Sequence, residues 1–469
     1  MRLARETLIH FVGSVGTSIA GFLGTIVIAR LLGAEALGIY SLAIALLFWL
    51  DLPTTGIQQT IMKRVSEGTD REQYFTVGVL LNACLVAVVG ITVLVAEDAV
   101  NAYLGADLAL FLVVLFAANV TFGTLISGLQ AQKRVGVSGL LRGVERFLRT
   151  GFQFVLIIAS YAVVGLVVGH ALSLLVAAAV CLLFYEIGLE LPTLDQLRDS
   201  LAYAKYAWAS SIKGQAYGWL DTIVLGVFVS ASLIGIYEVA WSLASTLILV
   251  NNSIGQTLFP ELSELNEQDD HTTIRQHLEE AMAFSGIVVL PGLVGAAILG
   301  TDLLRIYSPE FTEGSLVLLI LIVARMANSF GKVFYTSTYA LDRPDLAFRI
   351  VIPVILTNLI LNVVLISQIG WYGAAIATAI TGVVNLVLSY AVLRYLLGTI
   401  TLPSGEIAKQ TLASLVMGGA IYILTTVVPT SSVTTVVLVF VGAAIYTVSL
   451  IGISGRFRRK LFGVVGSFS

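Results

Sequence analysis

The chain is a succession of apolar stretches, each long enough to cross a lipid bilayer. A membrane-spanning helix needs roughly 20 predominantly apolar residues, and in hydrocarbon the helix must satisfy its own backbone polar groups. The chain has 469 residues, 57% hydrophobic and 12% charged, whereas a soluble domain carries about 25% charged residues. We therefore predict an all-α integral membrane protein with about 14 transmembrane helices, at residues 8–31, 38–62, 75–96, 108–131, 146–164, 167–185, 206–228, 236–259, 278–300, 315–336, 347–367, 374–395, 407–428 and 433–454.

The fifth and sixth of these helices lie in one apolar run from Phe147 to Tyr185. A run of that length is too long for one membrane span. Gly165, Gly169 and His170 mark the place where we expect the run to break.

Positive charge is concentrated on one side of the predicted helices. With the N-terminus in the cytoplasm, 21 of the 26 Lys and Arg residues fall on the inner side, among them Arg142, Arg146 and Arg149. The longer outer loops, 97–107 and 301–314, carry acidic residues instead. Because loops rich in Lys and Arg stay in the cytoplasm, we expect a multi-pass protein of the cell (plasma) membrane with both termini cytoplasmic.

A hairpin near the N-terminus recurs in the middle of the chain. Residues 25–28 and 36–43 match residues 222–225 and 233–240 at one common offset of 197 residues, with a shared Gly-Ile-Tyr. The copies are offset by six predicted helices, an even number, so the two halves have the same orientation and are expected to be related by an axis along the membrane normal. We predict two pseudo-symmetric six-helix lobes, 1–200 and 201–395, followed by two additional C-terminal helices and a basic cytoplasmic tail, 396–469.

Short motifs connect this plan to a known family. Residues 29–33 read Ala-Arg-Leu-Leu-Gly and precede Gly-Ile-Tyr at 38–40, and residues 370–378 read Gly-Trp-Tyr-Gly-Ala-Ala-Ile-Ala-Thr. Over its whole length, including the twelve-plus-two helix plan, the chain resembles the Wzx-like lipid-linked oligosaccharide flippases of the multidrug/oligosaccharidyl-lipid/polysaccharide (MOP) transporter superfamily. The resemblance implies export of a polyprenyl-(pyro)phosphate-linked oligosaccharide to the outer leaflet by alternating access, for cell-surface polysaccharide or glycoprotein synthesis.

Several cations lie inside the predicted helices, where each charge costs roughly 2.5–3.5 kcal/mol and therefore needs a reason. Arg325, Asn328 and Lys332 share one helix face by their spacing, and Lys213 lies in the helix at 206–228. We predict that these four line a cationic cavity between the lobes that binds the substrate phosphate, and the family motif adds Arg30. In the alternative interpretation, Lys332 extends to the membrane interface and Arg30 anchors the first helix.

Two acidic residues are also embedded. Asp51 precedes Pro53 in the second predicted helix, and Asp221 lies in the seventh. Each carboxylate is a candidate ligand for a coupling ion, H⁺ or Na⁺, or a counter-charge to the embedded cations. The structural alternatives stay open: Asp51 caps a helix broken by the proline, and Asp221 forms an ion pair with another helix.

Several sequence features that other classes of membrane protein require are absent from this chain. No Gly-x-x-x-x-Gly-Lys-Ser/Thr loop is present, so ATP hydrolysis by that route is excluded. The four histidines are scattered and suggest no metal site. No outer loop is long enough for the active site of a membrane glycosyltransferase or polymerase, so we expect neither an enzyme nor a cofactor.

An ion-coupled drug or small-molecule antiporter of the same superfamily is the alternative function, although those transporters usually have twelve helices.

The expected partners follow from the flippase interpretation. They are lipid-linked oligosaccharide, membrane lipids, and glycan polymerases or glycosyltransferases that make or use the substrate. We expect no nucleic acid among them.

Overall fold

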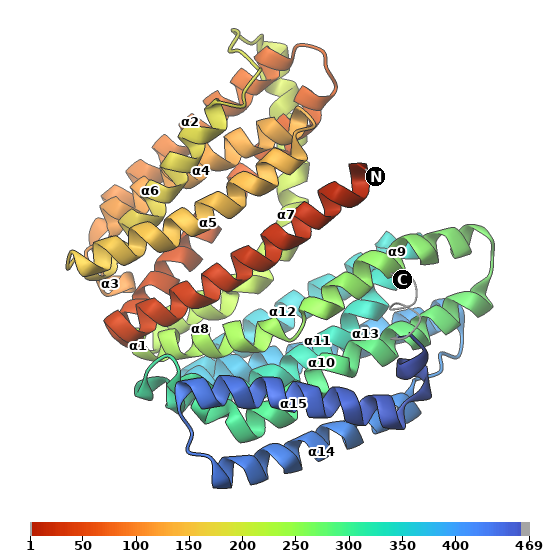
Figure 1. Cartoon of the computed structure of the whole chain (residues 1–469). Coiled ribbons are helices and arrows are strands. Elements are labelled where there is room, and N and C mark those ends of the chain that lie inside the picture. The colour runs from red at the N-terminus through yellow and green to blue at the C-terminus, as the bar shows by residue number, and fades with distance from the viewer. Residues whose placement is uncertain (1, 461–469) are drawn as a thin grey trace. The chain divides into compact units, whose positions relative to one another are not determined.

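A computed structural model describes the backbone of residues 2–460 and the side chains of 21–208, 218–248, 251, 254–255 and 258–460. All regular secondary structure in this part of the chain is helical (Figure 1). Ten of the described helices are long and apolar enough to span a membrane. These features confirm the predicted class, an all-α protein with multiple membrane helices.

The contacts between helices divide the chain into two compact units, Met1–Gly235 and Ile236–Ser469. In the first unit, α2, α4, α5 and α6 lie side by side (Figure 1), and α7 packs along α1. The predicted lobes, which the repeat defines, stay a prediction. The first unit contains α1(Arg2–Ser66), α2(Arg71–Val95), α3(Glu97–Leu104), α4(Ala109–Ala131), α5(Val135–Ile158), α6(Ala162–Leu182), α7(Leu194–Phe228) and the start of α8(Ala231–Thr246).

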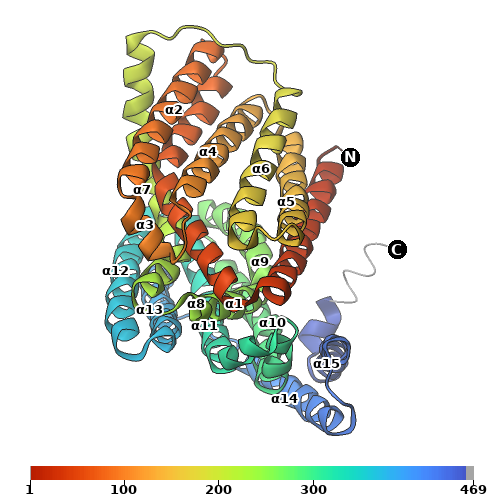
Figure 2. The ribbon, with the colours of Figure 1, turned by 90° about the vertical axis from the view of Figure 1, so that its left-hand side faces the viewer.

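In the second unit, α11 is the central helix. It packs against α9, α10 and α13, while α12 packs on α13 (Figure 2). The last two helices, α14 and α15, pack against each other and on α10. The remaining elements are α9(Leu249–Glu267), α10(His271–Arg305), η1(Pro309–Gly314), α11(Ser315–Ala340), α12(Pro344–Ile369), α13(Trp371–Leu397), α14(Ser404–Val427) and α15(Ser432–Ile453).

The first two predicted spans form one element, α1, which kinks at Gly33. The backbone of Gly33 has φ 81° and ψ −178°, a conformation that glycine adopts readily because it lacks a Cβ. The eighth predicted helix, 236–259, is instead divided between α8 and α9, with an interruption at residues 247–248. The two longer loops that were predicted to lie outside the membrane contain α3 and η1.

The expected break between the fifth and sixth helices at Gly165–His170 is wrong. The turn lies at residues 159–161, and both glycines are inside α6. A Cβ added at Gly169 would lie 2.8 Å from the backbone nitrogen of Gln153 in α5. The glycines therefore let α5 and α6 approach closely, as small residues do between membrane helices, and do not end a helix.

The two copies of the repeat meet at a close helix crossing in the first unit. A Cβ added at Gly38 would lie 1.7 Å from the carbonyl oxygen of Ala231, and one added at Gly235 would lie 2.0 Å from that of Ala34. Ala231 and Gly235 are the residues that the 197-residue offset pairs with Ala34 and Gly38. Equivalent small residues, four apart in each copy, thus pack reciprocally, in the manner of small-xxx-small crossings.

This crossing leads to a prediction about stability. A Gly38→Ala variant should lower the melting temperature, because its methyl group would overlap the Ala231 carbonyl and overpacking costs about 1–3 kcal/mol. The matched control is Gly419→Ala in α14, where an added Cβ meets nothing within 4 Å. Thermal unfolding of the purified full-length protein in detergent would compare the two variants. Equal melting temperatures for Gly38→Ala and the unchanged protein would contradict the close crossing.

Candidate functional site

Arg325 in α11 is held by side chains of α8. Its guanidinium carbon lies 3.7 Å from the ring centroid of Trp241, and its Nη2 donates a hydrogen bond to Ser245 Oγ at 2.6 Å. Trp241 in turn stacks on Tyr237, with 6.3 Å between the ring centroids. A guanidinium on an aromatic face is stabilised by the ring quadrupole, more strongly where water is excluded. The structure thus gives this embedded cation an ordered position.

Asn328 and Lys332, which were predicted to share one face of α11 with Arg325, differ from it in their surroundings. Asn328 lies beside α13, where a Cβ added at Gly382 would be 3.3 Å from its Nδ2. That Nδ2 is buried and has no hydrogen-bond partner in the described part of the chain. Lys332, two turns from Arg325, has an exposed side chain. Arg325 therefore contacts α8, while Asn328 faces α13. The residues predicted to share one face of α11 thus lie against two different helices.

Asp51 lies beside the proline in the second half of α1. Its carboxylate accepts a hydrogen bond from the Thr54 hydroxyl, which also lies 2.8 Å from the Asp51 carbonyl oxygen. A side-chain hydrogen bond joins Asp51 to Asn119 of α4. These contacts are those of a residue that organises the helix around Pro53 and ties α1 to α4. Its role as a coupling-ion ligand stays a prediction.

The three remaining predicted residues belong to α1 and α7. Asp221 is buried, with 5% of its surface exposed, close in sequence to Trp219, which stacks on Phe48 of α1 with 5.0 Å between ring centroids. Arg30 is exposed on α1, three residues before the kink. Lys213 lies in α7, but its side chain is outside the described residues. Their proposed roles in binding stay predictions.

The first unit contains a charged network that was not predicted from the sequence. Arg149 of α5 donates from Nε and Nη2 to the two carboxylate oxygens of Glu145, at 2.9 and 2.8 Å. Ser173 of α6 donates to the same carboxylate at 2.8 Å. Glu145 is 5% exposed, so its charge is compensated by a bidentate arginine and a hydroxyl instead of water.

A second part of this network joins α1, α5 and α6. Gln153 Nε2 donates to the Tyr40 hydroxyl at 3.0 Å and to the Leu166 carbonyl at 2.9 Å. The Tyr40 hydroxyl lies 3.1 Å from His170 Nδ1. His170, which looked like a helix break in the sequence, is therefore a buried partner of the repeat tyrosine.

Arg146 places a further cation against α1. A Cβ added at Gly21 would lie 2.6 Å from Arg146 Nη2, so the absence of a side chain at Gly21 makes room for the guanidinium. Arg142, Arg146 and Arg149 follow a four- and three-residue spacing, which puts them on one face of a helix. That spacing was the signal available in the sequence, but the positive-inside count had assigned all three to the membrane boundary.

Two protein-family models match this chain. The family model described as "Polysaccharide biosynthesis protein" matches residues 3–266, and the one described as "Lipid II flippase MurJ" matches residues 155–442. A "Probable flippase AglR" of Haloferax volcanii is 30% identical over 98% of both chains. This chain belongs to the polysaccharide biosynthesis family of flippases. It is also 30% identical to the "Probable low-salt glycan biosynthesis flippase Agl15" of the same organism, over 95% of both chains.

Solved structures of other membrane proteins share the fold of this chain. The structure of "Lipid II flippase MurJ, inward closed conformation" aligns with a TM-score of 0.81 at 16% identity, over 97% of this chain and 100% of that chain. An inward-facing MATE transporter of the MOP superfamily aligns with a TM-score of 0.60 at 14% identity, over 83% of this chain and 94% of that chain. The chain is therefore a multi-pass membrane protein with the fold of MOP transporters, as its motifs predicted.

The buried ion pair of α5 generates a prediction. Glu145→Gln should destabilise the protein by about 3–5 kcal/mol, because it leaves the Arg149 charge uncompensated in a buried site. Adding Arg149→Gln should recover part of that loss, because the double variant removes both charges. The control is Glu67→Gln. The Glu67 carboxylate is exposed and pairs with Lys63 and Arg64, so this variant should change stability by less than about 1 kcal/mol. The melting temperatures of the three variants and the unchanged protein would be measured in detergent. Equal effects of Glu145→Gln and Glu67→Gln would contradict a buried charge network.

Proposed function

We propose that this protein translocates a polyprenyl-(pyro)phosphate-linked oligosaccharide from the cytoplasmic to the outer leaflet. The observation that carries the proposal is its similarity, over nearly the whole of each chain, to two proteins named as glycan flippases. The 24% identity to a "Lipopolysaccharide biosynthesis protein WzxC" of Escherichia coli, over 50% of this chain and 48% of that protein, points to the same class of substrate. Flipping requires no covalent chemistry, which agrees with the absence of an ATPase motif from the sequence.

The embedded arginines suit the phosphate of such a substrate. A guanidinium stays charged at physiological pH and presents donors that match phosphate oxygens. Arg325, ordered on Trp241 and Ser245, is the residue to which we assign phosphate binding in the second unit. The other residues to which we assign substrate binding are Asn328 and Lys332 in the second unit, and Lys213 and Arg30 in the first.

The direction of transport requires a source of energy. We assign that role to a coupled ion, H⁺ or Na⁺, with Asp51 and Asp221 as its candidate ligands, since a carboxylate can bind either. In this mechanism the two repeats rock against each other to expose the substrate alternately to each side, as in other repeat-built transporters. The bias of Lys and Arg favours both termini in the cytoplasm, and the proposed export of a glycan to the outer leaflet implies the plasma membrane.

The alternative function, an ion-coupled drug or small-molecule antiporter, is favoured by the MATE fold similarity. The coverage argues for the flippase, because the MurJ structure aligns with 97% of this chain and the MATE structure with 83%. Glycan polymerases and glycosyltransferases are the protein partners that the proposed substrate implies.

A deletion strain of the source organism tests the function. Loss of the gene should trap lipid-linked oligosaccharide on the cytoplasmic leaflet and lower surface glycan, and the unchanged gene should restore both. Unchanged glycolipid distribution, in a strain without a second flippase, would favour the antiporter. The readouts are surface glycan by lectin or antibody labelling and the accessibility of glycolipid to an added glycosidase.

Single variants then test the assigned cations. Arg325→Ala and Lys213→Ala should each lower glycan export roughly 10- to 100-fold, since a hydrogen bond to a charged group contributes about 1.5–3 kcal/mol. The matched control is Arg305→Ala, an exposed arginine paired with Asp302, which should export normally. Immunoblots and Arg325→Lys, which keeps the charge, separate loss of binding from loss of folding. Normal export by both alanine variants would contradict the assignment.

A further inference from the structure

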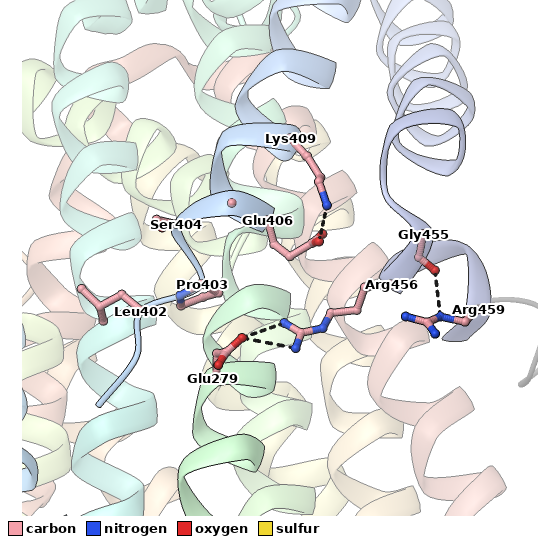
Figure 3. A pocket seen from close by; sticks show the side chains of 10 residues that line it. Glu279, Leu402, Pro403, Ser404, Glu406, Lys409, Gly455, Arg456 and Arg459 are labelled. Carbon is pink, nitrogen blue, oxygen red and sulfur yellow. Dashed lines mark hydrogen bonds and ion pairs between the residues drawn. The ribbon is translucent and has the colours of Figure 1, made fainter. Parts of the chain in front are cut away.

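A polar cavity of about 480 Å³ lies at one end of α10, α14 and α15 in the second unit. Its walls are the start of α14, Glu279 of α10, and the segment that follows α15 (Figure 3). Figure 3 shows charged side chains from all three segments converging on it. The volume is within the usual range for a small-molecule site, roughly 300–1,000 Å³.

The cavity holds more positive than negative side chains. Arg456 donates from both terminal nitrogens to Glu279, each at 3.2 Å, and Lys409 donates to Glu406 at 2.7 Å. Each carboxylate of the lining thus already has a cation. Arg459 also lines the cavity. Its side chain is exposed, and its Nε donates a 3.3 Å hydrogen bond to the Gly455 carbonyl. Its guanidinium is therefore the surplus charge of the site.

The start of α14 adds to this positive potential. Pro403 precedes the helix, and no side chain forms a capping hydrogen bond to its first turn. The Ser404 N–H donates to the Leu402 carbonyl, and the Glu406 carboxylate of this turn is paired with Lys409. The other first N–H groups of a helix have no partner within the helix, and with the helix dipole they favour an anion. An anion in the cavity would meet these donors on one side and Arg459 on the other.

The helices that lead to the cavity have apolar, exposed surfaces. Leu412, Leu415 and Val416 of α14 are each about half exposed, at 51%, 58% and 48%. Phe440 and Val448 of α15 are 72% and 70% exposed. Both helices are candidate membrane spans, so these side chains face lipid chains. The cavity then lies where the polar headgroup of a lipid packed along α14 and α15 would be.

We propose that this cavity binds the phosphate headgroup of an anionic membrane lipid, whose hydrocarbon chains lie along α14 and α15. Arg459 is the principal ligand, assisted by the first turn of α14, while Arg456 and Lys409 hold the walls through their carboxylate partners. Basic pockets between membrane helices bind anionic headgroups in this way. In the orientation proposed above, the site is in the cytoplasmic leaflet. It is distinct from the residues assigned to translocation and would tether the last two helices to the membrane.

The test is lipid binding by the purified full-length protein after exchange into detergent. Three probes are compared by thermal shift: short-chain phosphatidylglycerol, diacylglycerol with the same chains, and inorganic phosphate. Phosphatidylglycerol should stabilise the protein at lower concentration than either of the others. Equal stabilisation by diacylglycerol would overturn recognition of the phosphate. Stabilisation by inorganic phosphate at the same concentrations as by the lipid would overturn the membrane source.

A pair of adjacent arginines provides the matched variants. Arg459→Gln should weaken phosphatidylglycerol binding about tenfold, since one charge-assisted hydrogen bond is lost. Arg458→Gln removes an exposed charge from the same turn but not from the cavity lining, and should bind as the unchanged protein does. Equal affinities for the two variants would overturn the proposal. Because the readout is binding, the result does not depend on whether the protein proves to be a glycan flippase.

Discussion

Hydrocarbon contains no water to satisfy a buried polar group, and this constraint shapes both units of the protein. A helix satisfies its own backbone, but buried polar side chains need partners on their own helix or on another one. The Glu145 carboxylate accepts from Arg149 of the same helix and from Ser173 of α6, and Gln153 joins Tyr40 to α6 through the Leu166 carbonyl. Such a network would be costly if only half of its groups had partners, because unpaired charge in a low-dielectric interior is strongly destabilising. Each network thus restricts how its helices can pack.

The same absence of water removes the hydrophobic drive for helix association, so close van der Waals packing must replace it. Glycine allows close approaches in both units: Gly38 and Gly235 at the repeat crossing, Gly169 against α5, and Gly331 against Leu386 of α13. At the crossing, the internal repeat becomes a physical interface, because each copy supplies a small residue that the other copy needs. Gly21 uses the missing side chain differently, to make room for the Arg146 guanidinium.

The site could be predicted only in part, and α5 shows why. The predicted span began at residue 146, whereas α5 begins at Val135. Its early turns alternate Arg142, Glu145 and Arg146 with exposed apolar residues such as Leu140 and Phe147. The mean hydropathy of these turns, averaged over both faces of the helix, is too low to predict a membrane span. The arginines were therefore assigned to the cytoplasmic side of the membrane. For Arg325, the cost of a charge in an unbroken apolar stretch identified the residue, but its contact with Trp241 depends on how α8 packs on α11.

By itself, the sequence determined the membrane class, the helical architecture, the repeat and the family, because these depend on local hydropathy, residue spacing and motifs along one chain. Only the tertiary structure decided which embedded groups are partners. Tyr40 and His170 are 130 residues apart, Arg325 and Ser245 are 80 apart, and Glu279 and Arg456 are 177 apart. Hydropathy along the chain contains no information about such pairs, since the energy of a buried charge depends on which neighbouring helix presents its partner.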